Sequence, residues 1–169
     1  EGAIARGLRN KWIGHYQVYE RGNALIDLGH IMDKLEMIVR GGTFHCYPER
    51  VQIKFITELY YGANTFYDQY ENKEYRDMLS LDEEVEFNKT SKCRIIGLTL
   101  ETRPDFAIKN FSNLHLYPDD KNSFIGKRLY RIIKNLRRFG CTRIEFGIQH
   151  TDNDILANVN REGTIEDAI

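Results

Sequence analysis

The chain has 169 residues, of which 41% are hydrophobic and 29% are charged, and its formal net charge is -1. This length predicts one globular domain with a substantial core. The near-zero charge excludes a global attraction to nucleic acid, so any such contact must be a local basic patch, and no apolar run approaches the roughly 20 residues of a membrane span.

The cysteines predict a reducing environment. Cys46, Cys93 and Cys141 are far apart and form no C-x-x-C pair. This spacing favours free thiols in the cytoplasm over a disulfide framework or a zinc site. The N-terminus EGAIARGLRNKW has no apolar core of the kind found in signal peptides. It also lacks an initiating Met, which predicts a piece of a longer polypeptide.

The first 30 residues carry hydrophobic side chains at helical spacing. They predict one or two helices, broken near Gly14, with Gly29 as the final C-cap. The region is also basic, through Arg6, Arg9 and Lys11 among others. Two interpretations are open for these residues: a solvated helix face, or a patch that binds phosphates.

The stretch LEMIVRGGTF, residues 35–44, predicts a strand from Leu35 to Val39 that is buried on both faces. It runs into Gly41 and Gly42, which permit backbone conformations and close approaches that a Cβ forbids. The glycine pair is either a plain tight turn or a cofactor-binding turn.

A helix is predicted to begin near Pro48, because Val51, Phe55 and Leu59 recur at helical spacing. The acidic run over residues 68–90 predicts a surface helix or excursion. Within it, Ser80 and Glu83 have the spacing of a capping box. The carboxylates of this run show no metal-ligand spacing.

The stretch RIIGLTLETR, residues 94–103, predicts a second strand, which must stop at Pro104. Glu101 and Arg103 therefore fall at its C-terminal end. They could form a structural ion pair or contribute to a site.

Residues 106–126 are rich in turn formers and predict an inserted loop. Residues 127–139 predict an amphipathic helix that ends at Gly140, with a basic outer face that is either solvated or in contact with RNA. Its inward residues are expected to be Leu129, Ile132, Ile133 and Leu136. Residues 143–149 predict a third strand, and helices are expected from Asp152 to Val159 and over residues 165–169.

Apolar strands that alternate with helical segments are typical of an α/β fold with a parallel sheet. In such folds the C-terminal ends of the strands share one edge, and this edge carries the chemistry.

The motifs DKLEMIVRGGTF, GLTLETRPD and LRRFGCTRIEFGIQ, in this order, resemble the radical S-adenosylmethionine domain of the Elongator catalytic subunit family (Elongator complex protein 3). The resemblance implies that residues 1–169 are the central part of a partial (β/α)6 barrel of the TIM type. It implies S-adenosylmethionine and a [4Fe–4S] cluster as cofactors and acetyl-CoA as a co-substrate. The implied reaction is modification of the wobble uridine of tRNA at C5, with other Elongator-type subunits or a second copy as further partners.

The resemblance also assigns residues. Gly41, Gly42 and Thr43 match the glycine motif beside the methionine end of S-adenosylmethionine, and Lys34 matches a lysine associated with acetyl-CoA. Glu101 and Arg103 match one strand tip facing the cavity, and Glu145 and Gln149 match the next, where a carboxylate can bond a ribose. Arg6, Arg9 and Lys11 match a basic helix close to the tRNA path.

The cluster cysteines of the family are expected before residue 1, and its acetyltransferase domain is expected after the barrel, so no metal ligand is assigned here. His45 and His150 follow strand tips, but neither is assigned a catalytic role. Two alternatives stay open: a non-catalytic barrel remnant that binds tRNA or a partner, and another radical S-adenosylmethionine enzyme with a small-molecule substrate.

Overall fold

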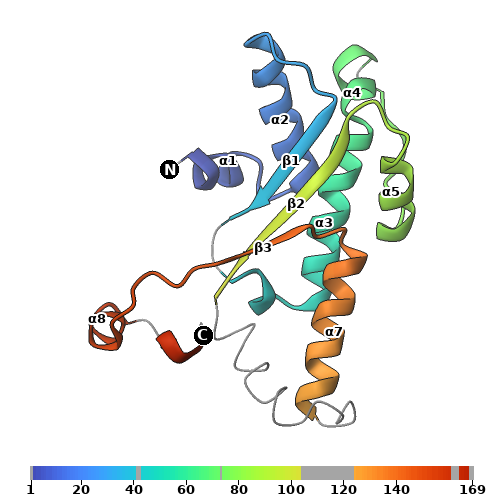
Figure 1. Ribbon diagram of the computed structural model, residues 1–169. Coiled ribbons are helices and arrows are strands. Elements are labelled where there is room, and N and C mark those ends of the chain that lie inside the picture. Colours follow the sequence, from blue (N-terminus) through green and yellow to red (C-terminus); the bar gives the residue numbers. More distant parts are fainter. Residues whose placement is uncertain (1, 41–42, 73, 104–123, 161–163, 168–169) are drawn as a thin grey trace.

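The computed structural model describes residues 2–40, 43–72, 74–103, 124–160 and 164–167 (Figure 1). The elements in chain order are α1 (Gly2–Arg9), α2 (Gly14–Asp27), β1 (Lys34–Val39), η1 (Phe44–Cys46), α3 (Glu49–Asn64), α4 (Phe66–Asn72), α5 (Leu81–Asn88), β2 (Arg94–Thr102), α7 (Phe124–Arg138), β3 (Arg143–Phe146), α8 (Asn153–Asn158) and η2 (Ile165–Asp167). Among the described residues, no helix combines the length and the apolarity that crossing a bilayer requires.

The three strands form one parallel sheet in the order β1-β2-β3. Val39 of β1 lies opposite Leu100 of β2, and Glu101 of β2 lies opposite Glu145 of β3. α3, α4 and α5 lie between β1 and β2 in the chain, and α7 lies between β2 and β3. Parallel neighbours require crossovers of this kind. The predicted α/β class, with parallel strands and flanking helices, is therefore confirmed.

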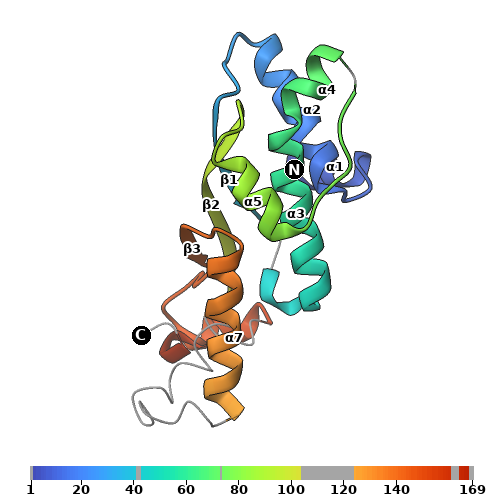
Figure 2. The same cartoon turned by 90° about the vertical axis from the view of Figure 1, so that its right-hand side faces the viewer.

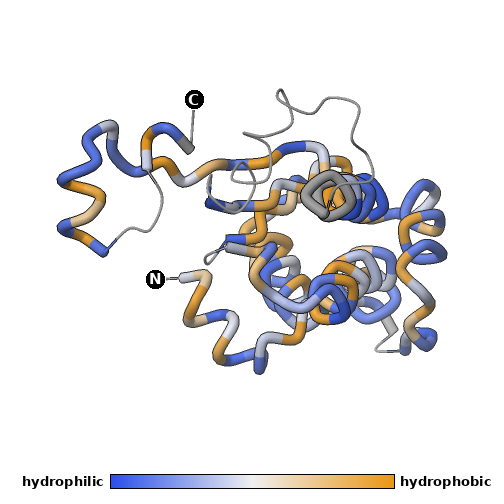
Figure 3. The backbone as a smooth tube through the Cα atoms, turned by 90° about the horizontal axis from the view of Figure 1, so that it is seen from below, coloured by the Kyte–Doolittle hydropathy of each residue, from blue (hydrophilic) through white to orange (hydrophobic). Residues whose placement is uncertain are grey.

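The helices cover one face of the sheet. Figure 2 shows the strands on one side of the molecule and α2, α3, α4 and α5 on the other. Leu98 and Leu100 of β2 are fully buried and join Ile56, Phe66 and Phe139 in the core. Full burial of such a side chain stabilises the fold by about 1.5–3 kcal/mol. Seen from below, hydrophobic and hydrophilic residues alternate along the helices (Figure 3), as expected for helices that bury one face.

The predicted ends of the helices agree with the structure at three places. Gly29 has a φ of 84° and Gly140 a φ of 70°, so both adopt the left-handed conformation just after a helix. The N–H of Cys141 bonds the carbonyl of Leu136, which closes α7. At the start of α5, Ser80 and Glu83 form the predicted capping box.

Other expectations are corrected. Ile38 is 46% exposed, so β1 is buried on one face and not on both, because its side chains alternate between the helices and the open face of the sheet. Ile133, on α7, is exposed although it was predicted to face inward, and Val51, in the first turn of α3, is exposed too. The helix predicted over residues 165–169 is the short 3-10 turn η2, and residues 168 and 169 lie outside the described part. Most of the loop predicted at 106–126 also lies outside it, and α7 begins within its last residues, at Phe124.

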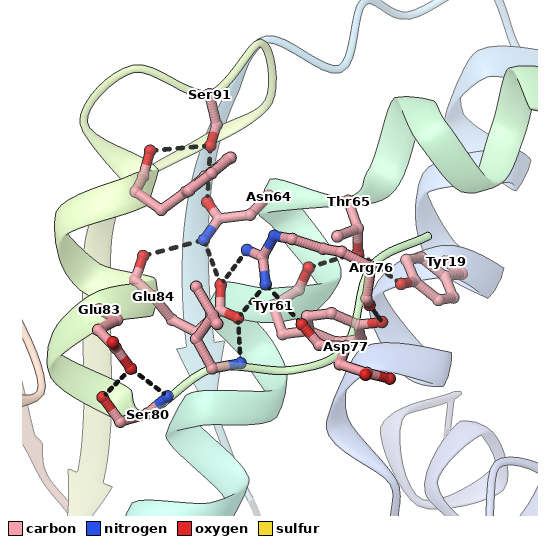
Figure 4. Close-up of polar contacts among 12 residues, drawn as sticks. Tyr19, Tyr61, Asn64, Thr65, Arg76, Asp77, Ser80, Glu83, Glu84 and Ser91 are labelled. Carbon is pink, nitrogen blue, oxygen red and sulfur yellow. Dashed lines mark hydrogen bonds and ion pairs between the residues drawn. The ribbon is translucent and has the colours of Figure 1, made fainter. Parts of the chain in front are cut away.

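The acidic run, predicted as a surface segment, contains a fully buried carboxylate (Figure 4). Glu84 has a side-chain exposure of 0% and receives two hydrogen bonds of 2.7 Å from the guanidinium of Arg76. Asn64 of α3 and the backbone N–H of Leu79 also donate to it. Arg76 in turn lies over the ring of Phe87, 4.5 Å from its centroid. This network holds the segment before α5 against α3.

Burial by itself would raise the pKa of Glu84, but the bonds from Arg76, Leu79 and Asn64 favour the charged form more strongly and hold the pKa below its ordinary value. Glu84 is therefore an ion in the core. Because the contacts that surround it are all internal, its role is structural.

Candidate functional site

The candidate site is the C-terminal edge of the sheet. β1, β2 and β3 are parallel, so their C-terminal ends share this edge. Thr43 follows β1 and is half-buried, and Arg103 follows β2 directly. Gly41 and Gly42, predicted to form the cofactor turn, lie outside the described residues. The parallel sheet thus brings the C-terminal ends of β1, β2 and β3 to the same edge.

Two carboxylates lie side by side on the open face of this edge. Glu101 and Glu145 are register partners on neighbouring strands, which places their Cα atoms about 5 Å apart. Side chains alternate along a strand, and Leu98 and Leu100 face the helices, so Glu101 faces the opposite side. Both carboxylates are half-buried. They can accept hydrogen bonds from hydroxyl or ammonium groups of a ligand that lies across the sheet.

The open face carries further polar groups, which the motifs of the sequence did not indicate. Thr99 is the register partner of Arg143, two residues before the carboxylate pair in each strand, so Arg143 lies on the same face as Glu145. Glu36 lies there too, because a Cβ built on Gly97 would lie 3.4 Å from its Cγ atom. Alternation with a period of two within RIEF is the sequence signal that could have found Arg143.

Gln149 does not extend a strand as predicted. β3 ends at Phe146, after which the N–H of Gly147 bonds the carbonyl of Thr102. The next N–H groups, of Ile148 and His150, bond within their own segment, so the ladder stops. Gln149 has a φ of 75°, in the left-handed region that is uncommon for residues other than glycine. It is exposed, in the irregular segment beyond the edge.

Lys34 lies at the other end of the sheet. It is the first residue of β1 and the register partner of Arg94, the first residue of β2. Five residue steps of about 3.3 Å separate it from Val39, so it lies roughly 16 Å from the C-terminal edge. The structure therefore does not bring Lys34 together with Glu101 and Glu145, and its association with acetyl-CoA stays a prediction about a separate position.

Among the basic residues of the N-terminal segment, one is already paired with a carboxylate of this chain. α1 lies on the same side of the sheet as α2 (Figures 1 and 2). The guanidinium of Arg9 is paired with Glu20 of α2, and both groups are exposed. In the sequence, Arg6 precedes Arg9 within α1 and Lys11 follows it. Lys11 lies just after the helix and has a φ of 51°. A role of these residues in tRNA binding stays a prediction.

A half-buried histidine lies behind the edge, on the helical side. His45 belongs to η1, and its Nδ1 atom lies 3.2 Å from the hydroxyl of Thr102, the last residue of β2. Thr102 is 2% exposed. Burial lowers the pKa of His45, so the ring is neutral near neutral pH.

The described residues do not fit an iron–sulfur cluster. Such clusters need several cysteine thiolates together. In the described part of the chain, no three or more histidine, cysteine or acidic side chains lie close enough to hold a metal. Burial raises the pKa of Cys93 to about 12, which makes it a poor thiolate. The open face does fit a polar organic ligand, because Glu101, Glu145 and Arg143 gather there.

A parallel sheet with helices on one face, and with polar groups on its other face at the C-terminal edge, defines a segment of a TIM-type α/β barrel. No protein-family model matches the chain. Elongator complex protein 3 of Drosophila melanogaster is 30% identical over 160 residues, and that of Schizosaccharomyces pombe is 31% identical over 164 residues. The human protein of the same name is 30% identical over 166 residues.

These matches cover 95% of the chain but only 23% or 24% of the relatives, so the chain spans about a quarter of their length. The solved structure of the archaeal Elp3 of Methanocaldococcus infernus, with an N-terminal deletion, is similar with a TM-score of 0.73 and 29% sequence identity. That match covers 96% of this chain and 31% of the archaeal one. Over 95% of its length the chain is therefore similar to one part of Elongator complex protein 3.

Proposed function

We propose that this chain provides part of the cofactor- and substrate-facing wall of a tRNA-modifying radical S-adenosylmethionine enzyme. The observation that carries the proposal is the polar open face at the C-terminal edge, found in a chain related over 95% of its length to Elongator complex protein 3. The finer proposal for the complete polypeptide is acetyl-CoA-dependent carboxymethylation of the wobble uridine of tRNA at C5.

The residues of this chain suit the binding of S-adenosylmethionine. The carboxylates of Glu101 and Glu145 can accept from the ribose hydroxyls or the ammonium group, and Arg143 can pair with the carboxylate of the methionine end. Thr43, beside the glycine pair, lies at the same edge. S-adenosylmethionine, once bound, supplies the radical chemistry, so these side chains need only bind, orient and exclude water.

The other components are also proposals. The [4Fe–4S] cluster requires cysteines that the described part of this chain does not gather, so we assign its ligands to the rest of the polypeptide. Acetyl-CoA is proposed as the co-substrate. tRNA is the proposed partner, with an unstacked loop base entering at the edge, as is usual when proteins act on RNA bases.

The test is anaerobic reconstitution of the complete polypeptide with iron and sulfide, followed by assay for 5′-deoxyadenosine. We expect cleavage of S-adenosylmethionine, and the Glu145→Gln variant should bind it more weakly by about tenfold, the equivalent of about 1.4 kcal/mol. A matched control is Glu86→Gln, on the exposed face of α5. If reconstituted protein forms no 5′-deoxyadenosine but still binds tRNA, the alternative of a non-catalytic tRNA-binding barrel replaces this proposal.

A further inference from the structure

His45 lies on the helical side of the sheet, away from the polar groups of the open face. It lies two residues after Thr43 and belongs to η1, whose Phe44 is anchored in the core against Phe139. Its Nδ1 atom bonds the hydroxyl of Thr102, 57 residues away in the chain. The bond therefore connects the segment after β1 to the tip of β2.

His45 and Thr102 are well placed to hold the tip of β2 against the segment that follows β1. Thr102 lies between Glu101 and Arg103, the two residues of this tip that were predicted to face the cavity. Its side chain faces the helices, with a residue exposure of 2%, so the hydroxyl has little access to water. A buried hydroxyl needs a hydrogen-bond partner, and the imidazole of His45 supplies one.

The ring of His45 is suited to a neutral hydrogen bond. Its Nε2 atom is also buried and has no partner among the described residues. Protonation would add a buried charge, and no carboxylate in the described part of the chain bonds the ring to compensate it.

We propose that His45 is a positioning residue, which fixes the segment from Thr43 to Cys46 against the tip of β2 through Thr102 and so holds the two sides of the cofactor site in register. This inference rests on the proposed function, because the ligand it serves is S-adenosylmethionine. His45 acts from behind the site, through Thr102 and its own segment, and does not touch the ligand.

The experiment compares two conservative pairs of variants in the complete polypeptide. Thr102→Val removes the hydroxyl and keeps the shape, whereas Thr102→Ser keeps the hydroxyl. His45→Ala removes the ring, whereas His45→Asn retains a polar atom near the position of Nδ1. Exposed His30, changed to Ala, is the control for a general effect of losing a histidine. The dissociation constant of S-adenosylmethionine is measured by calorimetry, and the melting temperature is measured in parallel.

We expect Thr102→Val and His45→Ala each to weaken binding about three- to tenfold, as the loss of one hydrogen bond predicts. Thr102→Ser and His45→Asn should restore most of the affinity. The double variant, which combines His45→Ala with Thr102→Val, should bind no more weakly than either single variant, because both substitutions remove the same bond. His30→Ala should leave the affinity unchanged.

The inference is overturned if wild-type protein binds S-adenosylmethionine and Thr102→Val lowers only the melting temperature, because the bond would then be merely structural. Additive losses in the double variant would overturn it too. If wild-type protein does not bind S-adenosylmethionine at all, the proposed function fails first. In that case, long-range ¹⁵N–¹H spectra of the imidazole in wild type and Thr102→Val separately show whether the bond to His45 exists.

Discussion

The buried ion pair between Arg76 and Glu84 gives a prediction whose magnitude follows from the structure. Arg76→Ala removes both 2.7 Å hydrogen bonds and leaves a carboxylate of zero exposure with only the donors of Asn64 and Leu79. Hydrogen bonds to charged groups contribute about 1.5–3 kcal/mol each. Because Arg76 is itself 27% exposed, water can reach part of the vacated space, so we expect a loss of about 3 kcal/mol rather than the full sum.

A second pair in the chain is a matched control. Arg138 also holds a carboxylate, Asp82, with two bonds, of 2.7 and 2.9 Å, but the side chains of this pair are 39% and 64% exposed. Exposed pairs contribute about 0–1 kcal/mol. Arg138→Ala should therefore cost no more than about 1 kcal/mol, although the bonds it removes have nearly the same lengths.

Urea unfolding, followed by circular dichroism and extrapolated to zero denaturant, measures both costs. A third variant carrying Arg76→Met and Glu84→Gln removes both charges and should recover much of the lost stability, since no unpaired buried ion is left. Equal losses for Arg76→Ala and Arg138→Ala would refute the reasoning, because burial would then not decide the strength of the pair.

Three further predictions concern conformation, pH and RNA. Gly140→Ala should lower the free energy of unfolding, measured in urea, by more than Gly29→Ala does. Both glycines have a positive φ, but only at Gly140 would the added Cβ meet another side chain, at 2.3 Å from the hydroxyl of Tyr60. We expect a loss of about 1 kcal/mol for Gly29→Ala and at least twice that for Gly140→Ala. Burial lowers the pKa of His15 and His45 below 6.5, so the unfolded state binds more protons at acid pH than the folded state. The free energy of unfolding should therefore fall as the pH drops below about 6.5, and replacing both histidines should flatten this part of the pH profile. Reversal of the basic residues of the N-terminal segment should weaken tRNA binding and reduce its salt dependence in a filter-binding titration, and an unchanged slope would remove this surface from the tRNA path. The residues to reverse to Glu are Arg6, Arg9 and Lys11.

Local patterns in the sequence predicted much of the fold. The apolar runs that end in Gly41 and Pro104 predicted β1 and β2, because strand composition and chain-breaking residues act locally. The glycines after α2 and α7 were identified for the same reason, since a left-handed residue after a helix favours glycine. The three tips at one edge followed from parallel strands alone. The sequence did not predict which face of β1 is covered, because a short apolar run such as Leu35 to Val39 does not indicate on which side helices will pack.

The contacts that the sequence did not reveal are long-range. Glu84 stands in an acidic run that is typical of a solvated surface, and its burial depends on Asn64, 20 residues away. The bond between His45 and Thr102 depends on the placement of η1 against β2, which no local pattern encodes. The separation of Lys34 from the carboxylates likewise follows from the direction of β1, since Lys34 begins the strand whose other end forms the edge.

The most direct test of the central claim is photo-crosslinking of radiolabelled S-adenosylmethionine to the complete polypeptide, with the labelled peptides identified by mass spectrometry. We expect label within residues 41–46, 99–103 and 143–149, at the C-terminal edge, and its loss when excess unlabelled S-adenosylmethionine is added. Label confined to segments away from that edge, such as α1 or the start of β1 at Lys34, would contradict the assignment of the open face as the cofactor-binding wall.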